Sequence, residues 1–280
     1  MRKTCFVYKT AGIGSAEVRG VQVAAALGCD VMRLKHFTPD HAARYEAIVY
    51  VKWLPPLATM EAVRRRGVLQ VVDALDNYSR WQFRRRAEWI DAFIASNFTH
   101  AVHLERAFGR PAVEIPHHHC NFEERRIPAG RTPPTLAFVG NPKHWRQSRR
   151  MVAGLRYPLL SSPRHATREE LAEIYLQADI GFAWRSEASK RSFNSAVKLV
   201  NYMSFGIPAV LGQETGYLQV ARHGEECLFA QTLGEARMLL DHLARDADLR
   251  RRMGEAAFEA ARPFHIRRVV ERYRSLLSTL

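Results

Sequence analysis

The four cysteines of this 280-residue chain form no metal-binding or redox motif. Cys5, Cys29, Cys120 and Cys227 are far apart, and no Cys-x-x-Cys spacing occurs. This pattern excludes a zinc knuckle and a dithiol redox centre of that type. We expect reduced thiols, most of them buried.

Long apolar segments are also lacking. No stretch approaches the roughly twenty apolar residues that a membrane-spanning helix needs. The first residues, Met-Arg-Lys-Thr-Cys-Phe-Val-Tyr, lead into a short strand without the apolar region of a signal peptide. We therefore expect a cytoplasmic protein, and peripheral attachment to the inner face of the cytoplasmic membrane stays open.

Acidic residues are scarce relative to basic ones. The chain has 42 Lys and Arg against 28 Asp and Glu, a net charge of +14, with arginine runs at 64–66, 84–86 and 149–150. An anionic membrane, a phosphorylated substrate or a nucleic acid would suit such a surface, but merely solvated arginine-rich helices would give the same charge. No helix-turn-helix, aromatic platform or zinc finger supports nucleic acid, so we expect no such partner.

The first half of the chain alternates short β-rich runs with helical segments. We expect strands at 5–8, 31–34, 47–51, 69–72, 92–95 and 113–115, and helices near 16–27, 59–66 and 81–88. This alternation is typical of a parallel sheet with helices on both faces. The turn after the first strand contains Gly12 and Gly14. It is either a ligand-binding loop at a helix N-terminus or a plain tight turn.

A second alternation follows a charged segment rich in proline and glycine. Residues 121–134 have the composition of an interdomain linker. Beyond them, we expect strands at 136–139, 179–184 and 227–229, capping boxes at Thr167–Glu170 and Thr232–Glu235, helices after both boxes and near 249–261, and a last amphipathic helix at 264–280. The first half is Rossmann-like, and the second half repeats its alternation.

The stretch 198–210 combines a helix, its stop signal and a strand. Asn194 or Ser195 is expected to cap the helix start, and Lys198 and Asn201 then lie on one face because they are three residues apart. The sequence Gly-Ile-Pro ends the helix before Ala-Val-Leu resumes as a strand. A polar face at a helix start suits a bound anion.

Several motifs of the second half occur together in a known group of enzymes. They are Ala178-Asp-Ile-Gly, Lys198-Leu-Val-Asn-Tyr-Met-Ser-Phe-Gly-Ile-Pro-Ala-Val210, the Gly216 and Gly224 loop, and Asp248-Leu-Arg-Arg-Arg-Met-Gly254. Together they resemble the C-terminal half of GT-B glycosyltransferases, particularly the large family 4 of retaining enzymes. Ile94-Ala-Ser-Asn97 followed by Val113-Glu-Ile-Pro116 is similar to the end of their N-terminal domain. The resemblance is specific over residues 178–262 and loose before residue 90.

The resemblance implies an α/β protein with the GT-B fold, in which two facing Rossmann-like domains enclose a deep interdomain cleft. We expect an N-terminal acceptor domain over 1–125, joined by the C-terminal helix 264–280, and a nucleotide-sugar-binding domain over 126–263. The fold implies no metal or other cofactor, because protein cations and helix N-termini meet the charge of the diphosphate.

The resemblance also assigns roles around the start of the helix. Lys198 occupies the position of the family's phosphate-contacting lysine, the alternative being a solvated lysine. The backbone of Ser195, Ala196 and Val197 would begin the helix beneath the diphosphate.

The chain departs from the family at two acidic positions. Asn201 stands where the family usually has a glutamate on the ribose hydroxyls, and Phe193 stands where a second glutamate is common. An amide bonds a diol more weakly than a carboxylate does. Glu187 or a backbone group would have to replace the missing contact.

Further donor contacts are expected at two glycine turns. Gly140 and Lys143 follow the first strand of the second domain, where the family has a glycine turn and a basic residue near the diphosphate. Arg185 is a further donor-binding candidate. Gly14 and Ser15 of the N-terminal domain are expected to approach the donor phosphates or the acceptor.

Two groups are candidates for catalysis. Asp76 follows the end of a predicted strand, and ligands gather beyond the carboxyl ends of strands in such sheets. A helix cap is the alternative for Asp76. His118, in the triple histidine 117–119, is the second candidate. Adjacent histidines on an extended segment point to opposite sides, so we expect no metal there. Arg19 and Asp73 are expected to bind the acceptor.

Three functions remain open from the sequence. The leading one is a nucleotide-sugar-dependent glycosyltransferase acting on a lipid-linked or polysaccharide acceptor in cell-surface glycan biosynthesis. The family resemblance implies that it retains the configuration of the donor sugar. The second keeps the fold as a noncatalytic sugar-nucleotide-binding or scaffold protein. The third, a basic nucleic-acid-binding protein, rests on charge alone.

Overall fold

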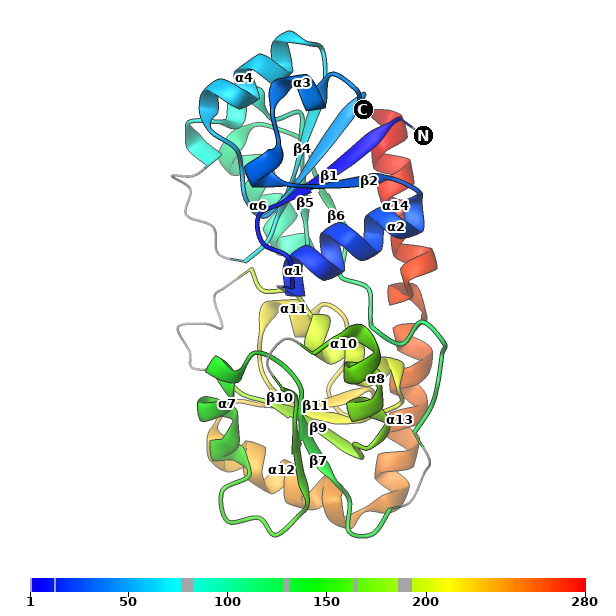
Figure 1. Ribbon diagram of the computed structural model, residues 1–280. Helices are drawn as coiled ribbons and strands as arrows, with labels where there is room; N and C mark the ends of the chain where they lie inside the picture. The colour runs from blue at the N-terminus through cyan, green and yellow to red at the C-terminus, as the bar shows by residue number, and fades with distance from the viewer. Residues whose placement is uncertain (1, 13, 77–82, 128–130, 164–165, 186–192) are drawn as a thin grey trace. The chain divides into compact units, whose positions relative to one another are not determined.

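The computed structural model describes residues 2–12, 14–76, 83–127, 131–163, 166–185 and 193–280. The chain divides into two compact units (Figure 1). Unit 1 contains residues 1–117, 193–195 and 266–280, and unit 2 contains residues 118–192 and 196–265. Two α/β domains with parallel sheets were expected from the sequence, and this expectation is confirmed.

Unit 1 is built on a six-stranded parallel sheet with the order β2-β1-β3-β4-β5-β6. Its strands are β1 (Thr4–Tyr8), β2 (Asp30–Arg33), β3 (Ala47–Val51), β4 (Leu69–Ala74), β5 (Ala92–Ala95) and β6 (Ala112–Glu114). Its helical segments are α1 (Gly14–Ala16), η1 (Glu17–Val21), α2 (Gln22–Leu27), η2 (Leu34–His36), α3 (Pro39–Ala42), α4 (Leu57–Arg65), η3 (Ala87–Trp89), α6 (Phe98–Phe108) and α14 (Ile266–Thr279). Helices α2 and α14 cover one face, and α3, α4 and α6 cover the other (Figure 1).

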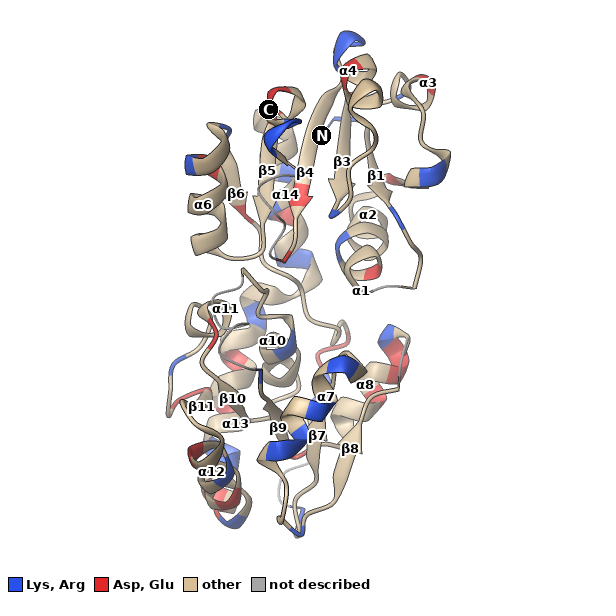
Figure 2. Cartoon of the chain, turned by 90° about the vertical axis from the view of Figure 1, so that its left-hand side faces the viewer, with Lys and Arg blue, Asp and Glu red and all other residues tan. Residues whose placement is uncertain are grey.

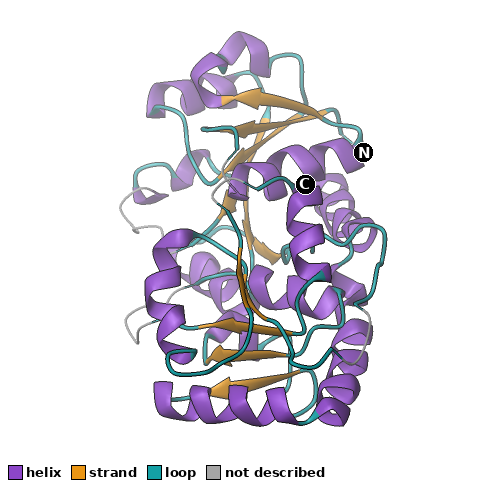
Figure 3. Ribbon diagram, turned by 60° about the horizontal axis from the view of Figure 1, so that its bottom comes forward, coloured by secondary structure: helices purple, strands orange, loops and turns teal. Residues whose placement is uncertain are grey.

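Unit 2 is built on a five-stranded parallel sheet with the order β11-β10-β9-β7-β8. Its strands are β7 (Leu136–Phe138), β8 (Leu159–Ser161), β9 (Ile180–Ala183), β10 (Ala209–Gly212) and β11 (Cys227–Ala230). Its helical segments are α7 (Pro142–Ser148), η4 (Arg149–Met151), α8 (Arg168–Leu176), α10 (Val197–Ser204), α11 (Thr215–Leu218), α12 (Leu233–Arg245), α13 (Ala247–Ala261) and η5 (Arg262–Phe264). Figure 3 shows these helices packed around the strands.

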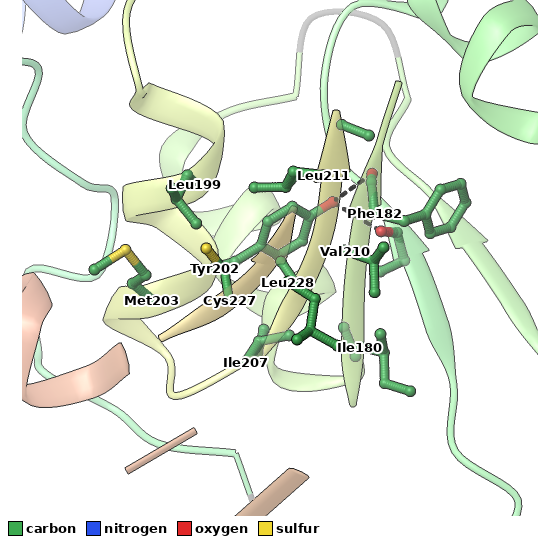
Figure 4. Packing of buried hydrophobic residues seen from close by; sticks show 14 of the residues in the cluster. Ile180, Phe182, Leu199, Tyr202, Met203, Ile207, Val210, Leu211, Cys227 and Leu228 are labelled. Carbon is green, nitrogen blue, oxygen red and sulfur yellow. Dashed lines mark hydrogen bonds between the residues drawn. The ribbon is translucent and has the colours of Figure 1, made fainter. Parts of the chain in front are cut away.

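Tyr202 joins helix α10 to the sheet of unit 2. Its ring lies against the strands, and its hydroxyl donates to the carbonyl oxygen of Ala137 at 2.7 Å (Figure 4). The same hydroxyl accepts from the backbone N–H of Val139 at 3.0 Å. A side chain at Gly181 would place a Cβ 2.6 Å from the Tyr202 ring. Only glycine therefore lets β9 approach α10 this closely.

The unit boundaries fall at 117/118 and 265/266, where the sequence placed them at 125/126 and 263/264. Residues 118–125 are bonded within unit 2. The His119 backbone N–H donates to the Phe264 carbonyl at 3.0 Å, and the Asn121 amide donates to the Ser204 carbonyl at 2.6 Å. The expected linker 121–134 thus begins as part of the second unit.

Several local expectations are confirmed and others are wrong. The Thr167–Glu170 capping box is complete. At Thr232, the side chain caps the helix, but Glu235 accepts from the backbone N–H of Gln231, so the box is not reciprocal. Helix α6 was missed, although Asn97 caps its start and Gly109 ends it. The predicted helix 81–88 lies partly outside the described residues.

Several arginines pair with nearby acidic residues, and Figure 2 shows where the charged residues lie along the chain. On α4, Arg65 pairs with Glu61 at 2.8 Å, and Arg66 pairs with Asp40 at 2.7 Å. Arg64 pairs with Asp91. These exposed pairs agree with the expectation of solvated, arginine-rich helices for this run. Within the described residues, no helix is long and apolar enough to cross a membrane.

Candidate active site

The candidate donor site lies at the carboxyl edge of the unit 2 sheet. Lys198 is in the first turn of α10, Val139 directly follows β7, Arg185 follows β9 by two residues, and Glu214 follows β10 by two residues. Parallel strands place such residues at one edge, where α/β proteins bind ligands. These are the ends of the three central strands of the sheet.

Lys198 is a buried cation, with 8% of its surface exposed. Its Nζ donates to the Val139 carbonyl at 2.6 Å and lies 4.1 Å from the centre of the Phe138 ring. Burial, aided by the Arg185 cation and opposed by the Glu214 carboxylate, lowers the pKa of Lys198 to about 7.

Gly140 makes room for this lysine. Its φ is +153°, and a Cβ at this position would collide with Lys198 Nζ. The Gly140 backbone is fixed from the other side, because its N–H donates to Ser162 Oγ at 2.9 Å. The glycine turn after the first strand of unit 2 therefore shapes the space around the buried cation.

The start of α10 differs from the expected one. The helix begins at Val197 with Ala196 as its N-cap, and no side chain caps it. Neither Asn194 nor Ser195 fills that position, so the capping prediction is wrong. At an uncapped helix start, backbone N–H groups remain that can donate hydrogen bonds to an anion.

Arg185 and Glu214 form an ion pair beside Lys198. Arg185 Nε lies 3.1 Å from Glu214 Oε1, and the side chains are 15% and 6% exposed. Sequence reasoning proposed Arg185 and missed Glu214. An acidic residue three positions beyond the predicted strand at 209–211 was the available signal.

The Lys143 side chain is exposed, whereas the Asn201 side chain is held by contacts within the protein. Lys143 is exposed in the first turn of α7, and its backbone N–H donates to Asn141 Oδ1 at 2.9 Å. Asn201 Oδ1 accepts from the backbone N–H of Cys120 at 2.8 Å, and its side chain also interacts with the Tyr175 hydroxyl. Because protein groups already contact the Asn201 side chain, the expected ribose contact finds no support in this structure.

Phe193 replaces the second acid of the family with an aromatic contact in unit 1. Its ring stacks on His100, with centroids 4.6 Å apart and an interplanar angle of 3°, and lies 4.7 Å from the His103 ring. Burial lowers the pKa of His100 to about 4. Glu187, the proposed substitute acid, lies outside the described residues.

Arg19 and Asp73 were expected to bind the acceptor, and the structure corrects this. Both side chains are fully buried. Arg19 donates to both Asp73 oxygens at 2.8 and 2.9 Å and to the carbonyls of Ile115 and Pro116. The Tyr273 hydroxyl donates to Asp73 at 3.0 Å. With no exposed surface, the pair supports the fold of unit 1 and does not offer an acceptor contact.

Asp76 lies at the carboxyl edge of the unit 1 sheet. Its carboxylate is 55% exposed and pairs with Lys52 Nζ at 2.6 Å. Both residues have positive φ, +62° for Asp76 and +66° for Lys52. Such backbone strain is often found at functional sites. Sequence reasoning proposed Asp76 and missed Lys52.

Gly14 and Ser15 begin α1 after β1, with Gly14 exposed and Ser15 half-buried.

His118 is buried, with 2% of its surface exposed. Its Nδ1 lies 3.0 Å from the carbonyl of His119, and its ring lies 5.4 Å from the Phe122 ring. A catalytic role would require a ring that a substrate can reach, whereas the His118 side chain is buried. No group of three potential metal-ligating side chains occurs in the described part of the chain.

A separate hollow of about 300 Å³ lies in unit 2, lined by Phe205, Pro208 and Arg250 among others. Pro208 directly precedes β10, so this hollow is at the amino edge of the sheet. Arg250 already donates to the carbonyls of Leu243 and Ala244. The candidate donor site at the carboxyl edge is distinct from it.

Comparison with known proteins establishes the family. Residues 131–275 match the family model described as glycosyl transferase-like. A search of curated protein sequences finds no match. Among solved structures, HepE from Anabaena, in complex with UDP and glucose, matches with a TM-score of 0.72 and 11% identity over 100% of both chains.

Two further solved structures share the fold. Sucrose-phosphate synthase from Thermosynechococcus elongatus matches with a TM-score of 0.71 and 12% identity over 100% of both chains. A glycosyltransferase from Rickettsia africae matches with a TM-score of 0.69 and 10% identity, covering 99% of this chain and 97% of that one. Membership in family 4 remains a prediction. The chain belongs to the glycosyl transferase-like family and is a glycosyltransferase with the GT-B fold.

Proposed function

We propose that this enzyme transfers a sugar from a nucleotide-sugar donor to a lipid-linked or polysaccharide acceptor in cell-surface glycan biosynthesis. The observation that carries the donor assignment is the buried Lys198 ammonium at the uncapped start of α10. A buried cation is costly unless an opposite charge or hydrogen bonds compensate it. A diphosphate in contact with Nζ and the helix start would provide that compensation.

The leaving diphosphate is stabilised by Lys198, with Arg185 as the second cation and Lys143 as an outer one. Preorganised cations at the point where negative charge develops lower the barrier of such a transfer. The reaction needs no metal in this proposal, because these side chains and the α10 backbone meet the diphosphate charge. Retention follows if the leaving phosphate assists attack on the same face of the sugar.

The acceptor binds to unit 1 at the carboxyl edge of its sheet. Asp76 is the catalytic or acceptor-orienting carboxylate, and Lys52 holds it in place through their 2.6 Å contact. A carboxylate within hydrogen-bond reach of a hydroxyl can orient it or accept its proton. The net charge of +14 supports an acceptor with phosphate groups or an anionic membrane surface at the cytoplasmic face.

A thermal-shift screen tests the donor assignment. UDP, GDP, ADP, dTDP and CMP compounds, with their sugars, are each added to the full chain. A donor that binds the folded state raises the melting temperature, by an amount that grows with its concentration relative to Kd. Absence of a shift with every compound, at concentrations up to several millimolar, would refute the proposal.

The family's acidic pair is absent from this chain, and Asn201 Oδ1 accepts a hydrogen bond from the Cys120 backbone N–H. Turnover of the bound donor therefore needs its own test. Release of free nucleoside diphosphate, by transfer or hydrolysis, measures it, and a donor that binds without being consumed would contradict the proposed transfer.

A further inference from the structure

Glu214 is an unexpected residue to find beside a proposed diphosphate site. It lies between β10 and α11 and is 5% exposed. A buried carboxylate repels a nearby anionic ligand, so its position requires another explanation. Its ion pair with Arg185 places it in the same group of charges as Lys198.

The surroundings of Lys198 suit both the charged and the neutral amine. Nζ donates one hydrogen bond, to the Val139 carbonyl, and a neutral amine can donate the same bond. Among the described residues, the charged groups that act on Nζ are Arg185 and Glu214. Two buried phenols neighbour this group of charges: Tyr202 bonds to the backbone of residues 137 and 139, and Tyr217 on α11 interacts with Glu214 and Arg185.

The two charged neighbours act on Lys198 in opposite directions. The Arg185 cation disfavours a second positive charge and the Glu214 carboxylate favours it, and together with burial they bring the pKa of Lys198 to about 7. At pH values above 7, the neutral amine therefore predominates in the free protein. A diphosphate placed against Nζ would favour the charged form.

We propose that binding of the donor diphosphate at Lys198 takes up one proton from solvent, and that Glu214 is the positioning residue that sets the pH at which this happens. This inference rests on the proposed donor site. The lone pair of Nζ forms a new N–H bond with this proton, and the bond that held the proton in a hydronium ion or buffer acid breaks. Glu214 acts through its charge and by holding Arg185, without touching the donor.

The expected consequence is a donor affinity that depends on pH. Below pH 7, the site is already charged and affinity changes little. Above pH 7, each further pH unit weakens binding by about tenfold, since only the protonated fraction binds without an added protonation cost. A site with a permanently charged lysine would show no such loss.

The experiment measures dissociation constants between pH 6 and 8.5 by calorimetry on the full chain. The probes are UDP-glucose, GDP-mannose and ADP-glucose, because their diphosphate diesters do not change charge in this range. For the probe that binds, affinity should fall above pH 7. At pH 8, titration in two buffers of different ionisation enthalpy should show uptake of close to one proton.

The variant Glu214→Gln tests the positioning role. Removing the carboxylate lowers the Lys198 pKa, so the pH midpoint of binding should move down, and the ratio of affinity at pH 6 to affinity at pH 8 should be larger than in the wild type, whatever the effect on affinity at pH 6. Arg185→Gln should move the midpoint up, whatever its effect on overall affinity. The matched control is Glu226→Gln, which removes another buried, ion-paired carboxylate, bound to Arg222. It should leave the midpoint unchanged.

The possible failures are separable. If neither these probes nor any compound of the thermal-shift screen binds at pH 6, both the proposed function and this inference fail. If a probe binds with the same affinity from pH 6 to 8.5 and without proton uptake, only the inference is overturned. If proton uptake occurs but a folded Glu214→Gln variant keeps the wild-type midpoint, the role of Glu214 is refuted. If the Glu214→Gln variant does not fold, the measurement of proton uptake by the wild type still confirms or overturns the proposed protonation of Lys198.

Discussion

Arg19 and Asp73 form a fully buried, two-pronged ion pair in unit 1, to which Tyr273 of α14 adds a third hydrogen bond. The Arg19 guanidinium also holds the carbonyls of Ile115 and Pro116, where β6 ends. One network thus ties α14, η1, β4 and the exit of β6 together. Its role is structural.

Breaking this network should destabilise unit 1 strongly. Asp73→Ala leaves the Arg19 charge buried without its partner, which costs about 3–5 kcal/mol of unfolding free energy. Tyr273→Phe removes one hydrogen bond to a charged group and should cost about 1.5–3 kcal/mol. Urea unfolding followed by circular dichroism measures both. An unchanged transition in Asp73→Ala would show that the pair does not support the fold.

Gly181→Ala should destabilise unit 2, because its Cβ would lie 2.6 Å from the buried Tyr202 ring. Overpacking of this kind costs about 1–3 kcal/mol. The control is Gly234→Ala in the first turn of α12, where the nearest atom, Thr232 Oγ1, is 3.9 Å away. The control should be neutral or more stable by up to about 1 kcal/mol. Equal melting temperatures for the two variants would contradict the close approach of β9 and α10.

Folding stability should fall in acid through His119. Burial, aided by His265 and His118, lowers the pKa of His119 to about 3, against about 6.5 in the unfolded chain. Between these values, only the unfolded state takes up the proton, so stability declines by about 1.4 kcal/mol per pH unit as the pH falls below 6.5. Above pH 6.5, His119 has no such effect.

A pair of variants isolates this contribution. Unfolding free energies at pH 5 and pH 7 should differ less in His119→Gln than in the wild type. His36→Gln, which removes an exposed histidine, should keep the wild-type difference. Identical pH dependence in all three proteins would mean that His119 is not held neutral by the fold.

Asp76→Asn tests the proposed role at the acceptor site. Asparagine tolerates the same left-handed backbone, and loss of an exposed ion pair changes stability by only about 0–1 kcal/mol. Transfer should slow by about 10²–10⁴-fold if Asp76 serves as a base, with donor affinity unchanged. Asp40→Asn, which also removes a carboxylate from an exposed ion pair, is the control. Wild-type transfer rates in Asp76→Asn would remove Asp76 from the mechanism.

The sequence predicted the two parallel sheets because buried parallel strands form short, continuous apolar runs separated by helices. Strand β5 was located at its observed bounds and β3 likewise. Helix α6 was overlooked because its apolar positions are interrupted by histidines and arginine, leaving the Asn97 cap and Gly109 as its clearest signals. Local patterns thus sufficed for the architecture.

The candidate site was less predictable, because it depends on contacts distant in sequence. Lys198 was found through its motif, whereas its carbonyl partner Val139 lies 59 positions away. Arg19 and Asp73 have the residue types of a ligand site, and only the fold reveals that they bind each other. Asn201 has a partner in Cys120, 81 positions away, that no local pattern indicates.

The most direct test of the donor site is the affinity of the variant Lys198→Ala, with Lys198→Met as a volume-matched form. Measured at pH 6.5 with the nucleotide-sugar that the thermal-shift screen identifies, Kd should rise at least about tenfold, or 1.4 kcal/mol, while the ligand-free melting temperature is kept. Lys3→Ala, which removes an exposed lysine, should bind as the wild type does. Unchanged affinity in folded Lys198→Ala and Lys198→Met would contradict the account of this site.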